Sequence, residues 1–174
     1  MPTKKLDLQK VKLKFPGIEV EWKTREIKNI PVHIFCKHSG KCVDVLDYSR
    51  DDGGSIVQYA MHGENNQRWI FEPAGNGFYH IVSVHSGKCL DIAGESLNDA
   101  AYVIQYHIHG GDNQKWYLKP LENGYYHIIN KHSGKCLDVK EASQDNAAKV
   151  FQYTAHGGNN QRWRLLIAEP LQYE

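Results

Sequence analysis

The chain has 174 residues, with 21 Lys and Arg, 20 Asp and Glu, and a mean hydropathy of −0.58. This length predicts one domain with a core of its own and room for a short extension. The balanced charge argues against nucleic acid as a partner, and because no apolar run is long enough to cross a bilayer, we expect no membrane insertion. The opening residues lack the apolar stretch of a secretory signal, but a removed leader would leave no trace, so the localisation stays open.

The first thirty residues are predicted to form a β-hairpin extension. Charged and apolar residues alternate between positions 10 and 22, with one Pro-Gly pair as the break. This pattern sets Phe15 opposite Ile18 and gives the hairpin one apolar face. The same register sets Lys14 opposite Glu19 on the charged face. Because an isolated hairpin is marginally stable in water, we expect the apolar face to pack on the rest of the chain, on a second copy of it as a homo-oligomer, or on a fused module.

Beyond the extension, residues 31–174 are predicted to form one domain built from three similar units. The units, 33–79, 80–126 and 127–168, repeat with a period of 47 residues. Each unit carries His-Ser-Gly-Lys-Cys-x-Asp near its front and Gln-x-Trp at its end. These motifs lie at His38–Asp44, His85–Asp91 and His132–Asp138, and at Gln67–Trp69, Gln114–Trp116 and Gln161–Trp163. A fixed period gives every offset the same structural meaning three times.

Each unit contains four short runs of β-branched and aromatic residues separated by turn residues. In the first unit the runs are 32–37, 41–45, 55–60 and 67–72. Helical periodicity is absent, so the pattern predicts an all-β fold of twelve strands. Three four-stranded units can close around a pseudo-threefold axis and so remove exposed sheet edges. A three-bladed propeller would have fewer blades than propellers usually have.

Three units with Cys-x-Asp near the front and Gln-x-Trp at the end resemble the ricin-type β-trefoil lectins and the related family 13 carbohydrate-binding modules. The resemblance covers residues 31–168 and implies a β-trefoil that binds carbohydrate. We interpret the three tryptophans of Gln-x-Trp as core residues, because they share an apolar strand position. The adjacent glutamines are expected to support the site through local backbone groups. They are Gln67, Gln114 and Gln161.

The four cysteines are interpreted as buried free thiols. Three of them occupy equivalent positions in the units, at Cys42, Cys89 and Cys136. Cys36 is the candidate partner if Cys42 forms a disulfide. The spacings do not match a zinc site, and no Asp-rich calcium loop recurs. We therefore expect no metal and no cofactor.

Each unit supplies what a sugar needs, which is an aromatic face for its C–H surface and planar polar groups for its hydroxyls. In the first unit these are Asp44, Tyr59, His62 and Asn66. The resemblance implies the same residue types for galactose-binding and xylose-binding members. The copies are Asp91, Tyr106, His109 and Asn113, then Asp138, Tyr153, His156 and Asn160. We expect the three aspartates to face solvent and ligand, so that their removal leaves the fold intact.

Two departures from the family pattern concern neighbouring residues. Gln58, Gln105 and Gln152 adjoin the tyrosines directly, where many relatives leave a residue between, so we assign them a supporting or peripheral role. Glu64 stands where the other units have Gly111 and Gly158, which predicts a distorted or differently charged first site that binds least well. If the site histidines accept hydrogen bonds from a sugar, acid weakens binding; if they only donate, acid changes little.

Three alternatives stay open. Asp44 could cap the turn after its strand, His62 could be a loop residue, and Tyr59 could belong to the core. A glycosidase would need a second carboxylate, and none recurs at an equivalent position in the units. A protein-binding β-trefoil, such as an inhibitor or a toxin-associated module, would not need the Asp, Tyr, His and Asn set. A carbohydrate-binding lectin with up to three sites and no catalysis is the function we predict.

Overall fold

The computed structural model describes residues 14–15, 18–19 and 30–168. Within this part of the chain, no helix is long and apolar enough to span a membrane. Twelve strands form one sheet, and short 3-10 helices lie between some of them. The strands are β3 (Val32–Cys36), β4 (Cys42–Val45), β5 (Ile56–Tyr59), β6 (Trp69–Pro73), β7 (Tyr79–Ser83), β8 (Cys89–Ile92), β9 (Val103–Tyr106), β10 (Trp116–Pro120), β11 (Tyr126–Asn130), β12 (Cys136–Val139), β13 (Ala148–Tyr153) and β14 (Trp163–Ile167). The all-β prediction of twelve strands is confirmed.

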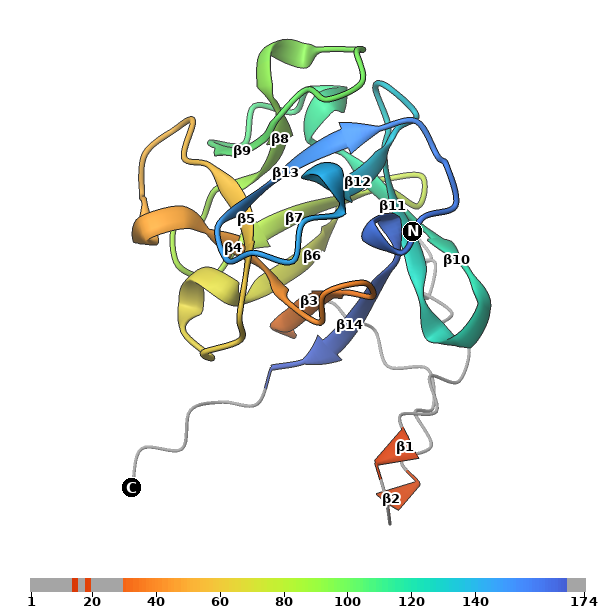
Figure 1. The fold of residues 1–174 in the computed structure, drawn as a ribbon. Coiled ribbons are helices and arrows are strands. Elements are labelled where there is room, and N and C mark those ends of the chain that lie inside the picture. The colour runs from red at the N-terminus through yellow and green to blue at the C-terminus, as the bar shows by residue number, and fades with distance from the viewer. Residues whose placement is uncertain (1–13, 16–17, 20–29, 169–174) are drawn as a thin grey trace.

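The first and last strands of the units close into a ring. Three long antiparallel pairs, β3 with β14, β6 with β7 and β10 with β11, share five residue pairs each. Single pairings join β3 to β6, β7 to β10 and β11 to β14, which completes the circle. Figure 1 shows β3 beside β14 and β10 beside β11. Every strand of the ring therefore has a neighbour on both sides, and no edge is left open.

The middle strands of the units form three hairpins, β4 with β5, β8 with β9 and β12 with β13. The hairpins contact one another in a cycle. Strand β5 pairs with β13, and isolated bridges join Ser55 to Ile104 and Tyr102 to Phe151. A ring with a triangle of three hairpins is the β-trefoil, with one unit of the 47-residue repeat for each third.

Turn chemistry explains why the first two strands of a unit fold back on each other. The Ser-Gly pair of the front motif places its glycine at a φ of +67°, +72° and +70° in the three units. Glycine adopts this left-handed backbone without the steric cost of a side chain. The chain then returns within a few residues, which sets the Cys-x-Asp segment at the start of the second strand.

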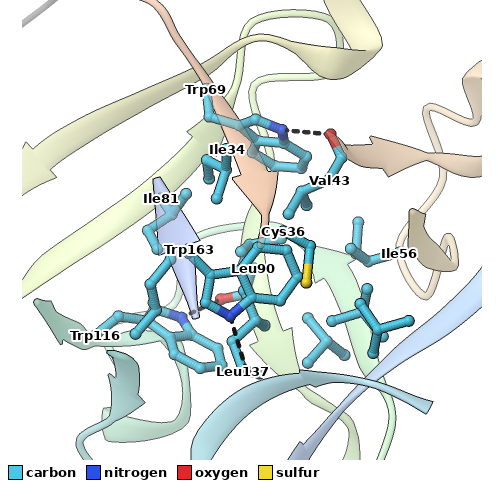
Figure 2. Close-up of a cluster of buried hydrophobic side chains, with 14 of the residues drawn as sticks. Ile34, Cys36, Val43, Ile56, Trp69, Ile81, Leu90, Trp116, Leu137 and Trp163 are labelled. Carbon is cyan, nitrogen blue, oxygen red and sulfur yellow. Dashed lines mark hydrogen bonds between the residues drawn. The ribbon is translucent and has the colours of Figure 1, made fainter. Parts of the chain in front are cut away.

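The three tryptophans of Gln-x-Trp lie in the core, as predicted, with an exposed fraction of 0% each. Each indole Nε1–H donates to a backbone oxygen of the second strand in its own unit, at 3.0, 3.1 and 2.9 Å. Figure 2 shows Trp69 bonded to Val43 in this way, and Trp163 to Leu137. The ring fills volume while its one polar atom stays paired, so burial of the tryptophan is stabilising. The bond also fixes the second strand, which carries the site aspartate.

All four cysteines are free and buried, which confirms the prediction of thiols, and Cys36 and Cys42 do not pair. Burial raises the pKa of Cys36 and Cys42 to about 12. The thiols therefore remain protonated and are inert core groups at neutral pH.

In the extension, β1 (Lys14–Phe15) pairs antiparallel with β2 (Ile18–Glu19). Lys14 lies opposite Glu19 and Phe15 opposite Ile18, which are the two expected pairs. The rest of the predicted hairpin, and the surface on which it packs, lie outside the described residues and stay predictions.

Candidate functional site

The site aspartate of each unit is held by buried amide donors. We call this network of one aspartate, one asparagine and one glutamine the floor of the site. Asp44 is the third residue of β4 and is 3% exposed. Its Oδ1 accepts from Asn66 Nδ2 at 3.1 Å and its Oδ2 from Gln67 Nε2 at 2.9 Å. The second and third units repeat these bonds at 3.0 and 2.9 Å, and at 2.9 and 2.8 Å. The floor therefore has the same hydrogen-bonded structure in all three units.

Both amides are themselves fixed by backbone groups. Asn66 Nδ2 also donates to Val45 O at 3.2 Å, and Gln67 Nε2 to Ala60 O at 3.0 Å. Gln67 Oε1 accepts from the backbone N–H of His62 at 2.9 Å, so this glutamine satisfies local backbone groups at both ends of its amide. The short 3-10 helix η2 (Asn65–Gln67) presents both side chains toward β4. The oxygen of the Asn66 side chain is buried and accepts no hydrogen bond from the protein, and the same holds for Asn113.

The site histidines lie over the aspartates. The Nε2 atom of His62 is 3.3 Å from Asp44 Oδ2, and the equivalent distances are 3.4 and 3.1 Å. The Nδ1 atom accepts the backbone N–H of the residue two positions later, at 3.2, 3.1 and 3.1 Å. An accepting Nδ1 requires the proton on Nε2, which therefore donates to the carboxylate. Neither nitrogen of the neutral ring is left as an acceptor for a ligand.

The site tyrosines lie beside the histidines and are exposed or half-buried. Tyr59 and Tyr153 are each 37% exposed, and Tyr106 is half-buried. The tyrosine and histidine rings meet edge to face, with centroids 6.1, 6.0 and 5.9 Å apart in the three units. The structure thus brings the four predicted residue types together in every unit, with an aromatic surface beside a hydrogen-bonded carboxylate.

The expectation that the aspartates face solvent is wrong. Asp91 is 3% and Asp138 is 1% exposed, as buried as Asp44. Burial raises the pKa of all three carboxyl groups, and their amide and histidine donors oppose this shift. The sequence alone could not show this, because Asn and Gln at that spacing suit ligand binding as well as carboxylate binding. Each aspartate is therefore both a structural acceptor and the charge beneath the site.

Gln58, Gln105 and Gln152 support the fold between units instead of bordering the site. Gln105 is 0% exposed, and its Nε2 donates to Ser49 O at 2.9 Å and Asp51 O at 3.0 Å in the preceding unit. Its Oε1 accepts from Ser86 Oγ at 2.7 Å. The other two glutamines make the same three bonds in cyclic order. These glutamines clamp each hairpin to the loop of its neighbour, a relation that no single unit reveals.

The structure also shows a contact between units that we did not predict from the sequence, between Asp52 and His107. Asp52 accepts from both the backbone and the ring of His107, at 2.8 and 2.7 Å. The His107 ring lies against Tyr106, with centroids 4.7 Å apart. Asp99 and Asn146 make the equivalent backbone contacts with Thr154 and Ala60. The signal was present in the sequence as an Asp, Asp, Asn series at a spacing of 47 residues.

The rim of the sites differs between units, where rim means positions 48, 60 and 64 and their copies. Glu64 in the first unit is equivalent to Gly111 in the second. A Cβ added to Gly111 would lie only 2.6 Å from the Asn113 side chain and 2.7 Å from the His109 ring, so a side chain at this position is expected to be crowded. The first unit nevertheless keeps the hydrogen bonds of its floor and its histidine. The expected distortion is therefore absent from these contacts, and the charge of Glu64 remains as the difference.

The family model of the ricin-type beta-trefoil lectin domain matches residues 30–163. The chain belongs to the ricin-type β-trefoil lectin family. A comparison of this lectin with curated proteins returned no match. The ricin-type lectin fold is generally a non-enzymatic module for carbohydrate binding, and it also occurs as part of enzymes and toxins.

Solved structures with the same fold include designed and natural proteins. ThreeFoil, a designed threefold-symmetric protein, is 46% identical over 78% of this chain and 97% of its own, with a TM-score of 0.77. An exo-beta-1,3-galactanase from Clostridium thermocellum is 37% identical over 87% of this lectin and 32% of the enzyme, with a TM-score of 0.79. A ricin B-like lectin from Macrolepiota procera, solved in complex with lactose, is 20% identical over 79% and 95% of the two chains, with a TM-score of 0.69.

Proposed function

We propose that this protein is a lectin with three sugar sites, one in each unit, for galactose, N-acetylgalactosamine or xylose-type glycans. The observation that carries the proposal is the threefold recurrence of one arrangement, in which a tyrosine ring lies beside a histidine that contacts a buried carboxylate. A sugar would stack its C–H face on the tyrosine while its hydroxyls meet the aspartate carboxylate. Two lectins with the same fold, solved in complex with lactose and with GalNAc, support the galactose class.

The sites would act together as an adhesion or targeting module without catalysis. A shallow site for one sugar gives a Kd on the order of millimolar. Three sites on one rigid domain raise the avidity for a multivalent glycan by orders of magnitude. Hydrolysis would need a pair of carboxyl groups flanking the bond, whereas each floor supplies one carboxylate that already accepts three hydrogen bonds.

A glycan array with the full chain tests the proposal. We expect retention on galactose-terminated or xylose-based glycans at neutral pH, unchanged by a metal chelator. Isothermal titration with galactose, lactose and xylose then gives the number of sites. An array without any bound glycan, together with specific capture of a protein partner, would favour the protein-binding alternative.

A further inference from the structure

The first unit carries a set of aromatic rings that begins with the site tyrosine and histidine and continues to the second unit. Tyr48 is 50% exposed and lies beside the site histidine, with its ring centroid 6.1 Å from that of His62. The ring centroid of Tyr59 is also 6.1 Å from that of His62. Beyond Tyr48 lies His85, whose ring is 5.9 Å away. The row Tyr59, His62, Tyr48 and His85 therefore extends from the first site to the front loop of the second unit.

The backbone fixes where Tyr48 stands. It ends the 3-10 helix η1 (Leu46–Tyr48), which follows β4 directly, and its φ is +53°. The equivalent residues Glu95 and Ala142 have φ of +53° and +49°. The fold thus imposes the same left-handed conformation in all three units, and their side chains leave equivalent points of the backbone. The units differ here in the identity of the side chain, so Tyr48 is a property of this sequence and not of the fold.

Tyr48 is also anchored from the second unit. His85 Nε2 lies 2.7 Å from the carbonyl oxygen of Tyr48, to which it donates. The Arg50 guanidinium donates to the carbonyl oxygen of His85 at 2.8 Å. An exposed aromatic residue with a fixed backbone loses little conformational freedom when a ligand binds, which favours its use as a contact surface.

We propose that the first site is an extended site for an oligosaccharide of two or more residues, in which Tyr48 stacks against the sugar next to the one held by Asp44 and Tyr59. The inference rests on the proposed function of the site. Successive sugars in a chain offer successive C–H faces, and a row of rings matches that repeat. The second and third sites have an acid and a methyl group at this position, so they lack the stacking surface that Tyr48 provides.

The proposal also assigns a role to Glu64. Its charge at the rim weakens the first site for a monosaccharide, as the sequence predicts. The contact with Tyr48 offsets that weakness only when the ligand is long enough to reach it. Chain length, and not the identity of the first sugar, therefore distinguishes the three sites.

The test uses the full chain with the second and third sites weakened by Tyr106→Ala and Tyr153→Ala. Galactose and β-1,3-galactobiose, then xylose and xylobiose, are titrated by calorimetry or NMR. We expect the matching disaccharide to bind about threefold to tenfold more tightly than its monosaccharide, since one aromatic contact contributes on that scale. Adding Tyr48→Ala should abolish this advantage. Tyr102→Ala, an exposed tyrosine away from the row, is the matched control and should keep it.

A gain of function completes the test. In a chain with Tyr59→Ala and Tyr106→Ala, the third site remains, and Ala142→Tyr should confer the preference for a disaccharide on it. Equal affinities for both lengths, with or without Tyr48, would overturn the extended site while leaving the lectin function in place. If the unaltered protein binds none of these sugars, the proposed function and the extended site both fall.

Discussion

The floor of the site is the same in all three units, whereas the residues of the rim differ from unit to unit. The floor repeats the same aspartate, asparagine and glutamine with bonds that agree closely between units. The rim carries Tyr48, Glu95 or Ala142 at one position and Glu64, Gly111 or Gly158 at another. Buried groups must satisfy one another, so a change in one of them costs stability, whereas exposed groups are free to differ. Selectivity is therefore expected at the rim.

The largest loss of stability is expected for a change in the core, at a tryptophan of Gln-x-Trp. Trp116→Ala should lower the free energy of unfolding by about 3–5 kcal/mol, because it empties a fully buried volume and removes the hydrogen bond from the indole to Leu90 O. Urea unfolding followed by fluorescence or circular dichroism measures the change. Tyr102→Ala, at an exposed residue, should lower the free energy of unfolding by about 0.5 kcal/mol or less. An equally small loss for Trp116→Ala would contradict the contrast between buried and exposed residues.

The next effect concerns a floor aspartate. Asp138→Ala leaves the amides of Asn160 and Gln161 with one acceptor each in place of two. We expect a loss of about 2–4 kcal/mol in unfolding free energy as well as loss of binding at the third site. This contrasts with the sequence-based expectation that the fold would tolerate the change. A variant as stable as the parent protein would show that the aspartate is a ligand group alone.

The inter-unit clamp should have a smaller effect. Gln105→Ala removes the donors to Ser49 and Asp51 and should cost about 1–3 kcal/mol, without changing the number of sugar sites. Gln144→Ala is the matched control, because Gln144 is exposed and donates a single bond to His38. Equal stability of the two variants would mean that the hairpins hold together without the clamp.

These expectations separate what the sequence could predict from what it could not. The period of 47 residues established the strands, the threefold closure and the buried tryptophans, because each signal lies within one unit. The sequence also predicted the four residue types that the structure brings together in each unit, since their offsets recur. The burial of Asp44 and the clamp by Gln105 depend on which groups face each other across strands and units. Residue types and spacing carry no such information, and Tyr48 was missed because it does not recur.

Acid should affect binding through the aspartates. Burial holds the pKa of Asp44, Asp91 and Asp138 above the usual value, so the native state binds more protons than the unfolded chain between the two values. The contribution of these groups to stability therefore rises as the pH falls through the raised pKa. Protonation, however, neutralises the carboxylate beneath the sugar. We expect glycan retention to decline while the fold persists, and retention that survives below the usual Asp pKa of about 3.9 would contradict this.

The central claim is that the three site tyrosines, which lie over the same hydrogen-bonded floor in each unit, hold the sugar. The combined variant Tyr59→Ala, Tyr106→Ala and Tyr153→Ala removes these rings while leaving each buried network intact, so its circular dichroism should match that of the parent protein. Isothermal titration of the folded variant with lactose and xylobiose tests the claim most directly. The account predicts that binding falls at least tenfold, while Tyr102→Ala binds like the parent protein. Unchanged affinity in the folded triple variant would contradict the account.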